Sequence, residues 1–190
     1  SAFLHAAAVV KAGVYLLIRF STIFHDVAVW NWLLIVVGMG TAVMSAVFAV
    51  QKTDLKKLTA YSTVSHLGWI VATIGVGTPF AIAAALVHTL AHALFKSSLF
   101  MLIGVIDHEA GSRDIRRLGP LWNKMPWTFC SVVIGAASMA AVPPLLGFVS
   151  KEGMLTAFED APIGGTGQVI LLIVAAIGAF FTFKIGRASC

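Results

Sequence analysis

The chain has 190 residues, of which 59% are hydrophobic and only 11% are charged, and its formal net charge is +5. Because soluble domains average about 25% charged residues, this composition excludes a single soluble core and indicates an integral membrane protein. The basic residues are spread over short segments without an aromatic face beside them, so we expect no nucleic-acid partner. Cys130 and Cys190 match neither a metal-site spacing nor a disulfide framework.

Six apolar stretches predict an all-α polytopic transmembrane bundle. In chain order they cover residues 1–20, 30–50, 58–76, 79–106, 126–158 and 168–183. About 20 apolar residues in a helix match the ~30 Å hydrocarbon core of a bilayer. We expect the first stretch to be cut short at its start, and the fifth is too long for a simple crossing.

The basic residues divide unevenly between the two sides that these spans define. If each span crosses once, nine bases fall on one side, Arg19 alone falls on the other, and three lysines lie within spans. The nine are Lys52, Lys56, Lys57, Arg113, Arg116, Arg117, Lys124, Lys184 and Arg187. Because short cytoplasmic loops carry the excess of Lys and Arg, we expect the nine-base side to face the cytoplasm.

The fifth stretch contains a signal for a broken helix. Pro143 and Pro144 interrupt it, and Gly147 follows closely. Proline removes a backbone donor and clashes with the preceding turn, and irregular backbone at membrane depth lies within protein or lines a wet cavity. A kinked structural helix is the alternative. The ionisable pair Lys151 and Glu152 directly after the break favours a functional site.

Three lysines lie within spans, where each charge costs at least about 2.5–3.5 kcal/mol. Lys96 belongs to a set, because His88, His92 and Lys96 recur at every fourth residue and therefore share one stripe of a helix. Histidine gains and loses protons near neutral pH, so the stripe predicts a proton relay. Helix packing by polar side chains is the alternative. A metal site is disfavoured, since no carboxylate or cysteine of this helix completes it.

The remaining polar residues of the spans are harder to assign. Lys11 lies mid-span among small and apolar neighbours, and His5 lies six residues before it, on a different face of the helix. His66, among hydroxyl residues, suits a relay and helix packing equally. Asp54 and Lys56 lie at a membrane edge, where a solvated loop that sets topology is the simplest interpretation and a coupling role is the alternative.

Four ordered motifs resemble those of the antiporter-like membrane subunits. Residues 1–16 look like the eighth helix of these subunits, and residues 51–66 contain the TDxKxxxAYS pattern. Residues 88–96 match the central H-x3-H-x3-K relay, and residues 147–152 match GFxSK(D/E) after a broken helix. The family includes the large subunits of Mrp-type cation/proton antiporters and the proton-pumping subunits of NADH:quinone oxidoreductase. Residues 106–118 and 136–144, with Lys11, resemble the Mrp A subunit more closely.

The resemblance implies an architecture of two inverted five-helix repeats, each with a broken helix and a protonatable lysine. We expect residues 1–183 to supply the last helix of the first repeat and the whole second repeat, as a fragment of a longer protein. Residues 184–190 change character abruptly and suggest a junction that is foreign to the natural protein.

The resemblance also implies roles for the polar residues. His88, His92 and Lys96 would relay protons at the membrane centre, and Lys151 would be the terminal exchange site with Glu152 as its modulating partner. His5 would connect the two half-channels.

The expected function is exchange of Na⁺ or another monovalent cation for protons, within a multisubunit complex of the plasma membrane. The bilayer, the other antiporter subunits, protons and cations are the expected partners. We expect no redox cofactor or metal, because the chain has no haem, flavin or cluster motif. A proton-pumping subunit of NADH:quinone oxidoreductase is the first alternative, and a membrane scaffold without transport activity is the second.

Overall fold

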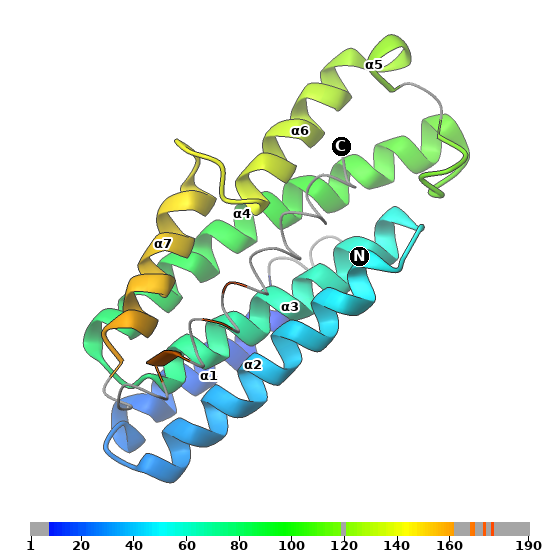
Figure 1. Cartoon of the computed structure of the whole chain (residues 1–190). Coiled ribbons are helices and arrows are strands. Elements are labelled where there is room, and N and C mark those ends of the chain that lie inside the picture. The colour runs from blue at the N-terminus through cyan, green and yellow to red at the C-terminus, as the bar shows by residue number, and fades with distance from the viewer. Residues whose placement is uncertain (1–7, 119–120, 162–167, 170–172, 174–175, 177–190) are drawn as a thin grey trace.

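The computed structural model describes residues 8–118, 121–161, 168, 169, 173 and 176. Seven helices follow one another in this part of the chain (Figure 1). They are α1 (Val9–Phe24), α2 (Ala28–Val50), α3 (Leu55–Gly75), α4 (Pro79–Ala110), α5 (Leu121–Lys124), α6 (Pro126–Met139) and α7 (Leu146–Glu159). The prediction of an all-α fold is confirmed for these residues.

The predicted limits agree with the helix ends to within about four residues, except at the start of the first span: α1 begins at Val9, and residues 1–7 lie outside the described part of the chain. α4 begins at Pro79 as predicted, with the Thr78 side chain capping its start, and it continues past the predicted end to a left-handed cap at Gly111. α3 begins three residues earlier than predicted, because the Asp54 carboxylate caps its first turn. The sixth predicted span, 168–183, lies almost wholly outside the described residues.

α2 and α3 form a closely packed antiparallel pair. A Cβ atom on Gly38 would lie 2.6 Å from the backbone nitrogen of Ala72, and one on Gly68 would lie 2.6 Å from that of Ala42. Both contacts are too short for any side chain larger than hydrogen. The Ser65 hydroxyl donates to the Ala42 carbonyl across the same interface at 2.8 Å. Small residues and one interhelical hydrogen bond are the usual way in which membrane helices approach closely.

The fifth predicted stretch is broken where the two prolines predicted it. α6 ends at Met139 and α7 begins at Leu146, and the two half-helices follow each other along α4 (Figure 1). A Cβ on Gly147 would clash with the Ser138 carbonyl, so this glycine allows the start of α7 to approach the end of α6. Val132 of α6 packs in one core cluster with Leu99, whereas Phe158 of α7 packs in another with Ala81. The broken helix therefore runs along the whole of α4 once.

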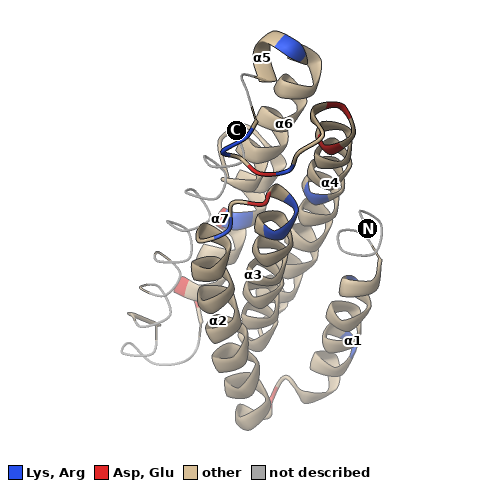
Figure 2. Ribbon diagram, turned by 90° about the vertical axis from the view of Figure 1, so that its right-hand side faces the viewer, with Lys and Arg blue, Asp and Glu red and all other residues tan. Residues whose placement is uncertain are grey.

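The loops before α3 and after α4 lie at the same end of the bundle. Leu55 N–H donates to the Arg113 carbonyl, and Ile115 N–H donates to the Thr53 carbonyl, both at 3.0 Å. Charged residues gather at this end (Figure 2). The seven described bases of the predicted basic side thus share one end, as expected, and Arg19 near the end of α1 lies toward the other. Lys184 and Arg187 lie outside the described residues.

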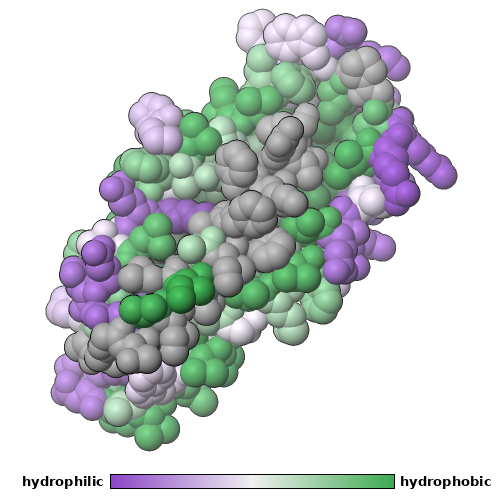
Figure 3. Space-filling model, in the orientation of Figure 1, coloured by the Kyte–Doolittle hydropathy of each residue, from purple (hydrophilic) through white to green (hydrophobic). Residues whose placement is uncertain are grey.

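The outer surface is apolar and the interior contains the polar groups. Exposed fractions reach 78% for Val29 and 84% for Trp127. Apolar residues cover much of the flank in Figure 3, and hydrophilic residues gather mainly toward the ends. Among the described helices, α2 and α4 are long and apolar enough to cross a membrane. A surface of this kind suits lipid rather than water.

Candidate functional site

Lys96 lies at the centre of α4 and is wholly buried. Its ammonium group donates to the Ser62 hydroxyl, to the Thr59 carbonyl at 3.4 Å and to the Met139 sulfur at 3.2 Å. These acceptors come from α3 and from the last residue of α6. An ammonium has three hydrogens, so all three have a partner, and every partner is neutral. Within the described residues Lys96 forms no ion pair.

A hydrogen-bonded pair of histidines lies next to Ser150, and the three residues come from α3, α4 and α7. His66 of α3 and His88 of α4 are both buried, and His66 Nδ1 lies 3.1 Å from His88 Nε2. His88 Nδ1 lies 2.9 Å from the hydroxyl of Ser150 on α7. His66 therefore belongs to the buried network, which the sequence alone left undecided between relay and packing.

His92 occupies the gap between this pair and Lys96. It is wholly buried, and both of its ring nitrogens lack a hydrogen-bond partner within the described part of the chain. Its ring centroid lies 5.4 Å from that of His66 and 5.5 Å from that of Phe95. His66 Nε2 is also without a partner among the described residues. Buried polar atoms are almost always hydrogen-bonded to protein or water, so these three nitrogens are exceptions within the network.

The stripe predicted on α4 is thus confirmed as a geometric feature. His88, His92 and Lys96 are all buried, and within the described residues no hydrogen bond joins any two of them. Residues four apart on a helix are about 6 Å apart along its axis. The hydrogen bond of His88 therefore goes to His66 of α3 and not to the next residue of the stripe.

Lys151 lies half-buried on α7, next to Ser150 in sequence, and Glu152 is exposed. No ion pair joins Lys151 and Glu152 in the described structure. Lys151 follows directly after Ser150, whose hydroxyl contacts His88, so the second half-helix places this lysine one residue from the histidine pair.

The other candidates lie further away. Lys11 is half-buried on α1, whose buried residues Val14 and Ile18 pack against α3. His5 lies outside the described residues. Among described residues no group of three His, Cys, Asp or Glu side chains is placed to hold a metal.

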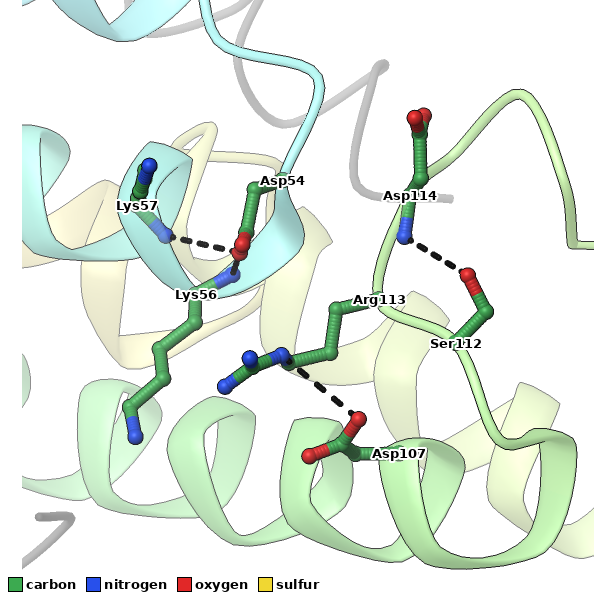
Figure 4. Close-up of polar contacts among 7 residues, drawn as sticks. All are labelled: Asp54, Lys56, Lys57, Asp107, Ser112, Arg113 and Asp114. Atoms are coloured by element: carbon green, nitrogen blue, oxygen red, sulfur yellow. Dashed lines mark hydrogen bonds and ion pairs between the residues drawn. The ribbon is translucent and has the colours of Figure 1, made fainter.

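Asp54 and Lys56 lie at the charged end of the bundle (Figure 4). The Asp54 carboxylate accepts from the backbone nitrogens of Lys56 at 2.8 Å and Lys57 at 3.2 Å, which is a helix cap. The Lys56 side chain extends toward α4, where it lines a pocket together with Asp107 and Arg113. Arg113 Nε lies 3.5 Å from Asp107 Oδ1. These contacts support the structural interpretation of Asp54, and a coupling role stays a prediction.

The sequence did not single out Ser62, Met139 or Ser150. Ser62 precedes His66 by four residues and so shares its helical stripe, which was a usable signal. Ser150 stood out only as part of a motif. Met139 had no signal, because its contact with Lys96 depends on where α6 ends.

The family described as NADH:quinone oxidoreductase/Mrp antiporter, TM matches residues 1–182. The chain belongs to this family. The A subunit of the Na(+)/H(+) antiporter of Bacillus subtilis is 45% identical over 199 residues, covering 96% of the chain and 25% of the relative. The A/B subunit of a probable K(+)/H(+) antiporter of Rhizobium meliloti is 44% identical over 181 residues, covering 95% of the chain and 18% of the relative.

A solved structure of the Mrp complex from Dietzia sp. DQ12-45-1b is also similar. Its matching chain is 59% identical, with a TM-score of 0.94, over 98% of this chain and 21% of that one. The chain is therefore a helical membrane protein of the antiporter-like fold, and the relatives named here are antiporter subunits and a chain of an Mrp complex. It spans between about a fifth and a quarter of the length of these relatives.

Proposed function

We propose that the chain is part of the A subunit of an Mrp-type monovalent cation/proton antiporter of the plasma membrane, and that its buried histidine–lysine network carries protons. The observation that carries the proposal is Lys96, wholly buried and held by three neutral acceptors. A lysine that only joined helices would be a costly choice at membrane depth. Its position beside three buried histidines supports proton transfer instead.

The proposed path runs from Ser150 through His88 and His66 to His92 and Lys96. The first two steps follow hydrogen bonds of 2.9 and 3.1 Å. The steps to His92 and onward to Lys96 have no direct bond, and the unpartnered nitrogens of His66 and His92 support water as the bridge. Histidine suits each step, since one ring nitrogen accepts while the other donates.

Lys151 is the proposed exchange site at the far end of this path. It lies on the half-helix that follows the break, where transporters place ion sites, and next to the serine that contacts His88. Glu152 would modulate Lys151 as its neighbour in sequence. Lys11 and His5 would link the network to a half-channel built by the preceding part of the full-length protein.

The proposed exchange is of Na⁺ or another monovalent cation for protons. The relatives support both choices of cation, because one is named as a Na(+)/H(+) antiporter subunit and another as a K(+)/H(+) antiporter subunit. Residues 1–183 would form the last helix of a first repeat and all of a second. Other subunits of the complex are the proposed partners, because the similar solved structure is of an Mrp complex.

A proton-pumping subunit of NADH:quinone oxidoreductase is the second candidate, because the matching family includes both kinds of subunit. The same buried network would then carry protons driven by distant redox chemistry. The neighbouring genes distinguish the two candidates. Genes for small antiporter subunits would support the antiporter, and genes for quinone-reductase subunits would support the respiratory complex.

Substitution of Lys96 tests the proposal in the full-length protein within its assembled complex. Lys96→Ala should abolish cation-driven proton movement, measured by dye quenching in inside-out vesicles, while the yield of complex stays close to that of the wild type. Lys57→Ala, which removes an exposed base of the same charge, is the control and should exchange normally. Wild-type exchange in Lys96→Ala would remove the relay from the mechanism.

A further inference from the structure

The hydroxyl of Ser150 is the contact between the second half of the broken helix and the histidine pair. Ser150 is 1% exposed. Its oxygen lies 2.9 Å from His88 Nδ1 and 3.1 Å from the Gly147 carbonyl, one turn earlier on α7. The Ser150 hydroxyl thus has two neighbours. The Gly147 carbonyl only accepts a hydrogen bond, whereas His88 Nδ1 accepts or donates one.

The number of hydrogens available allows two arrangements of the hydrogen bonds that connect Ser150, His88 and His66. In the first, the Ser150 hydroxyl donates to the Gly147 carbonyl, so its oxygen accepts from His88 Nδ1–H. A neutral imidazole has a single N–H, so His88 Nε2 accepts from His66 Nδ1–H. His66 Nε2 then carries a bare lone pair, and this is the buried atom that has no partner among the described residues.

The second arrangement reverses the two bonds of His88 and gives up the bond from Ser150 to the Gly147 carbonyl. When the Ser150 hydroxyl turns to donate to His88 Nδ1, the His88 proton sits on Nε2 and is donated to His66 Nδ1. His66 Nε2 then carries the hydrogen. The orientation of the Ser150 hydroxyl on α7 therefore corresponds to whether His66 Nε2, on the ring that packs beside His92, is an acceptor or a donor.

We propose that Ser150 is a positioning residue that sets the direction of the His88–His66 hydrogen bonds and so prepares the pair to accept or to release a proton. The inference rests on the proposed relay. It gives the second half-helix a defined influence on the network, since any shift of α7 that moves Ser150 from His88 removes the directing group.

Ser65 shows what a merely structural serine does in the same bundle. It is as deeply buried, at 1% exposed, and it also joins two helices. Its hydroxyl donates to the Ala42 carbonyl at 2.8 Å, a partner that only accepts and fixes one direction. Ser65→Ala therefore removes a cross-helix hydrogen bond without touching a histidine and serves as the matched control.

The test compares Ser150→Ala, Ser150→Thr and Ser65→Ala in the full-length protein of the assembled complex. Ser150→Ala should lower the initial exchange rate about tenfold, the lower end of the effect that groups orienting a metal-bound histidine have on activity. Ser150→Thr, which keeps the hydroxyl, should restore most of the rate. Ser65→Ala should exchange at close to the wild-type rate.

Solid-state NMR of the complex with ¹⁵N-labelled histidine measures the tautomers of the histidines, which would not change if Ser150 served only in packing. In Ser150→Ala the ring ¹⁵N signals of His66 and His88 should show a changed balance between the Nδ1–H and Nε2–H tautomers. In Ser65→Ala this balance should stay as in the wild type. Unchanged histidine signals in Ser150→Ala overturn the proposal at any exchange rate. If Lys96→Ala abolishes exchange and Ser150→Ala leaves it intact, this inference fails alone, whereas normal exchange in Lys96→Ala removes the relay itself.

Discussion

Lys96 shows how a lysine can be accommodated at the centre of a membrane bundle in either protonation state. A charged amine uses all three acceptors around it, from Ser62, Thr59 and Met139. A neutral amine has two hydrogens and a lone pair, and the Ser62 hydroxyl is able to turn and donate to that lone pair. A carboxylate partner would instead hold the lysine charged. Neutral partners thus suit a residue whose charge changes during transport.

Lys151 should not tolerate a permanent charge. Lys151→Arg keeps the positive charge but removes the ability to release a proton, because arginine stays protonated at any workable pH. We expect loss of exchange in the assembled complex, measured in inside-out vesicles, with Lys57→Arg at the exposed end as a control that exchanges normally. Normal transport by Lys151→Arg would mean that the site needs only positive charge and exchanges no proton.

The elements of the bundle are placed by contacts between specific helices. α3 lies between α2, with which it shares the close glycine contacts, and α4, with which it shares the buried network. One face of α3 therefore packs on α2, and another face carries the groups that contact α4. The glycine pair therefore stabilises the α2–α3 interface and touches no residue of the network.

Gly38→Ala should destabilise this arrangement, whereas Gly40→Ala should not. A Cβ at Gly38 would lie 2.6 Å from backbone atoms of α3, but one at Gly40 meets nothing within 4 Å. Overpacking of this kind costs about 1–3 kcal/mol, and both changes gain up to about 1 kcal/mol of helix propensity. Thermal unfolding of the purified complex should show a lower midpoint for Gly38→Ala alone. Equal midpoints for the two variants would contradict the close packing of α2 on α3.

The whole molecule has one charged end, and this asymmetry predicts its orientation. The loops before α3 and after α4 are hydrogen-bonded to each other, and the seven described bases of the basic side lie at this end. The end of α7 and the turn between α3 and α4 lie at the other end (Figure 1). Because basic loops stay in the cytoplasm, the end with the loop after α4 should be cytoplasmic.

Cysteine labelling tests this orientation. Glu109→Cys and Asp160→Cys place thiols at exposed positions near the ends of α4 and α7, in a background without Cys130 and Cys190. An impermeant reagent should label Glu109→Cys only from the cytoplasmic face and Asp160→Cys only from the opposite face. Labelling of both from one side would show that α6 and α7 re-enter the membrane without crossing, and the proposed path through Lys151 would fail with it.

The sequence by itself determined the class of fold, most helix limits and the break in the fifth stretch. These features depend on local properties: apolar runs match the bilayer, proline at residues 143 and 144 removes helix donors, and loop charges report sidedness. The stripe of His88, His92 and Lys96 was equally local, since helical spacing alone puts the three on one face.

Only the tertiary structure decided what surrounds that stripe. His66 joins it because the packing of α3 on α4 brings the His66 and His88 rings to hydrogen-bond distance. Ser150 and Met139 join it because the broken helix lies along α4, with the end of α6 at Lys96 and the start of α7 at His88. Spacing along a chain specifies which residues share a face of one helix, but contacts between residues 40 or more positions apart depend on how the helices pack.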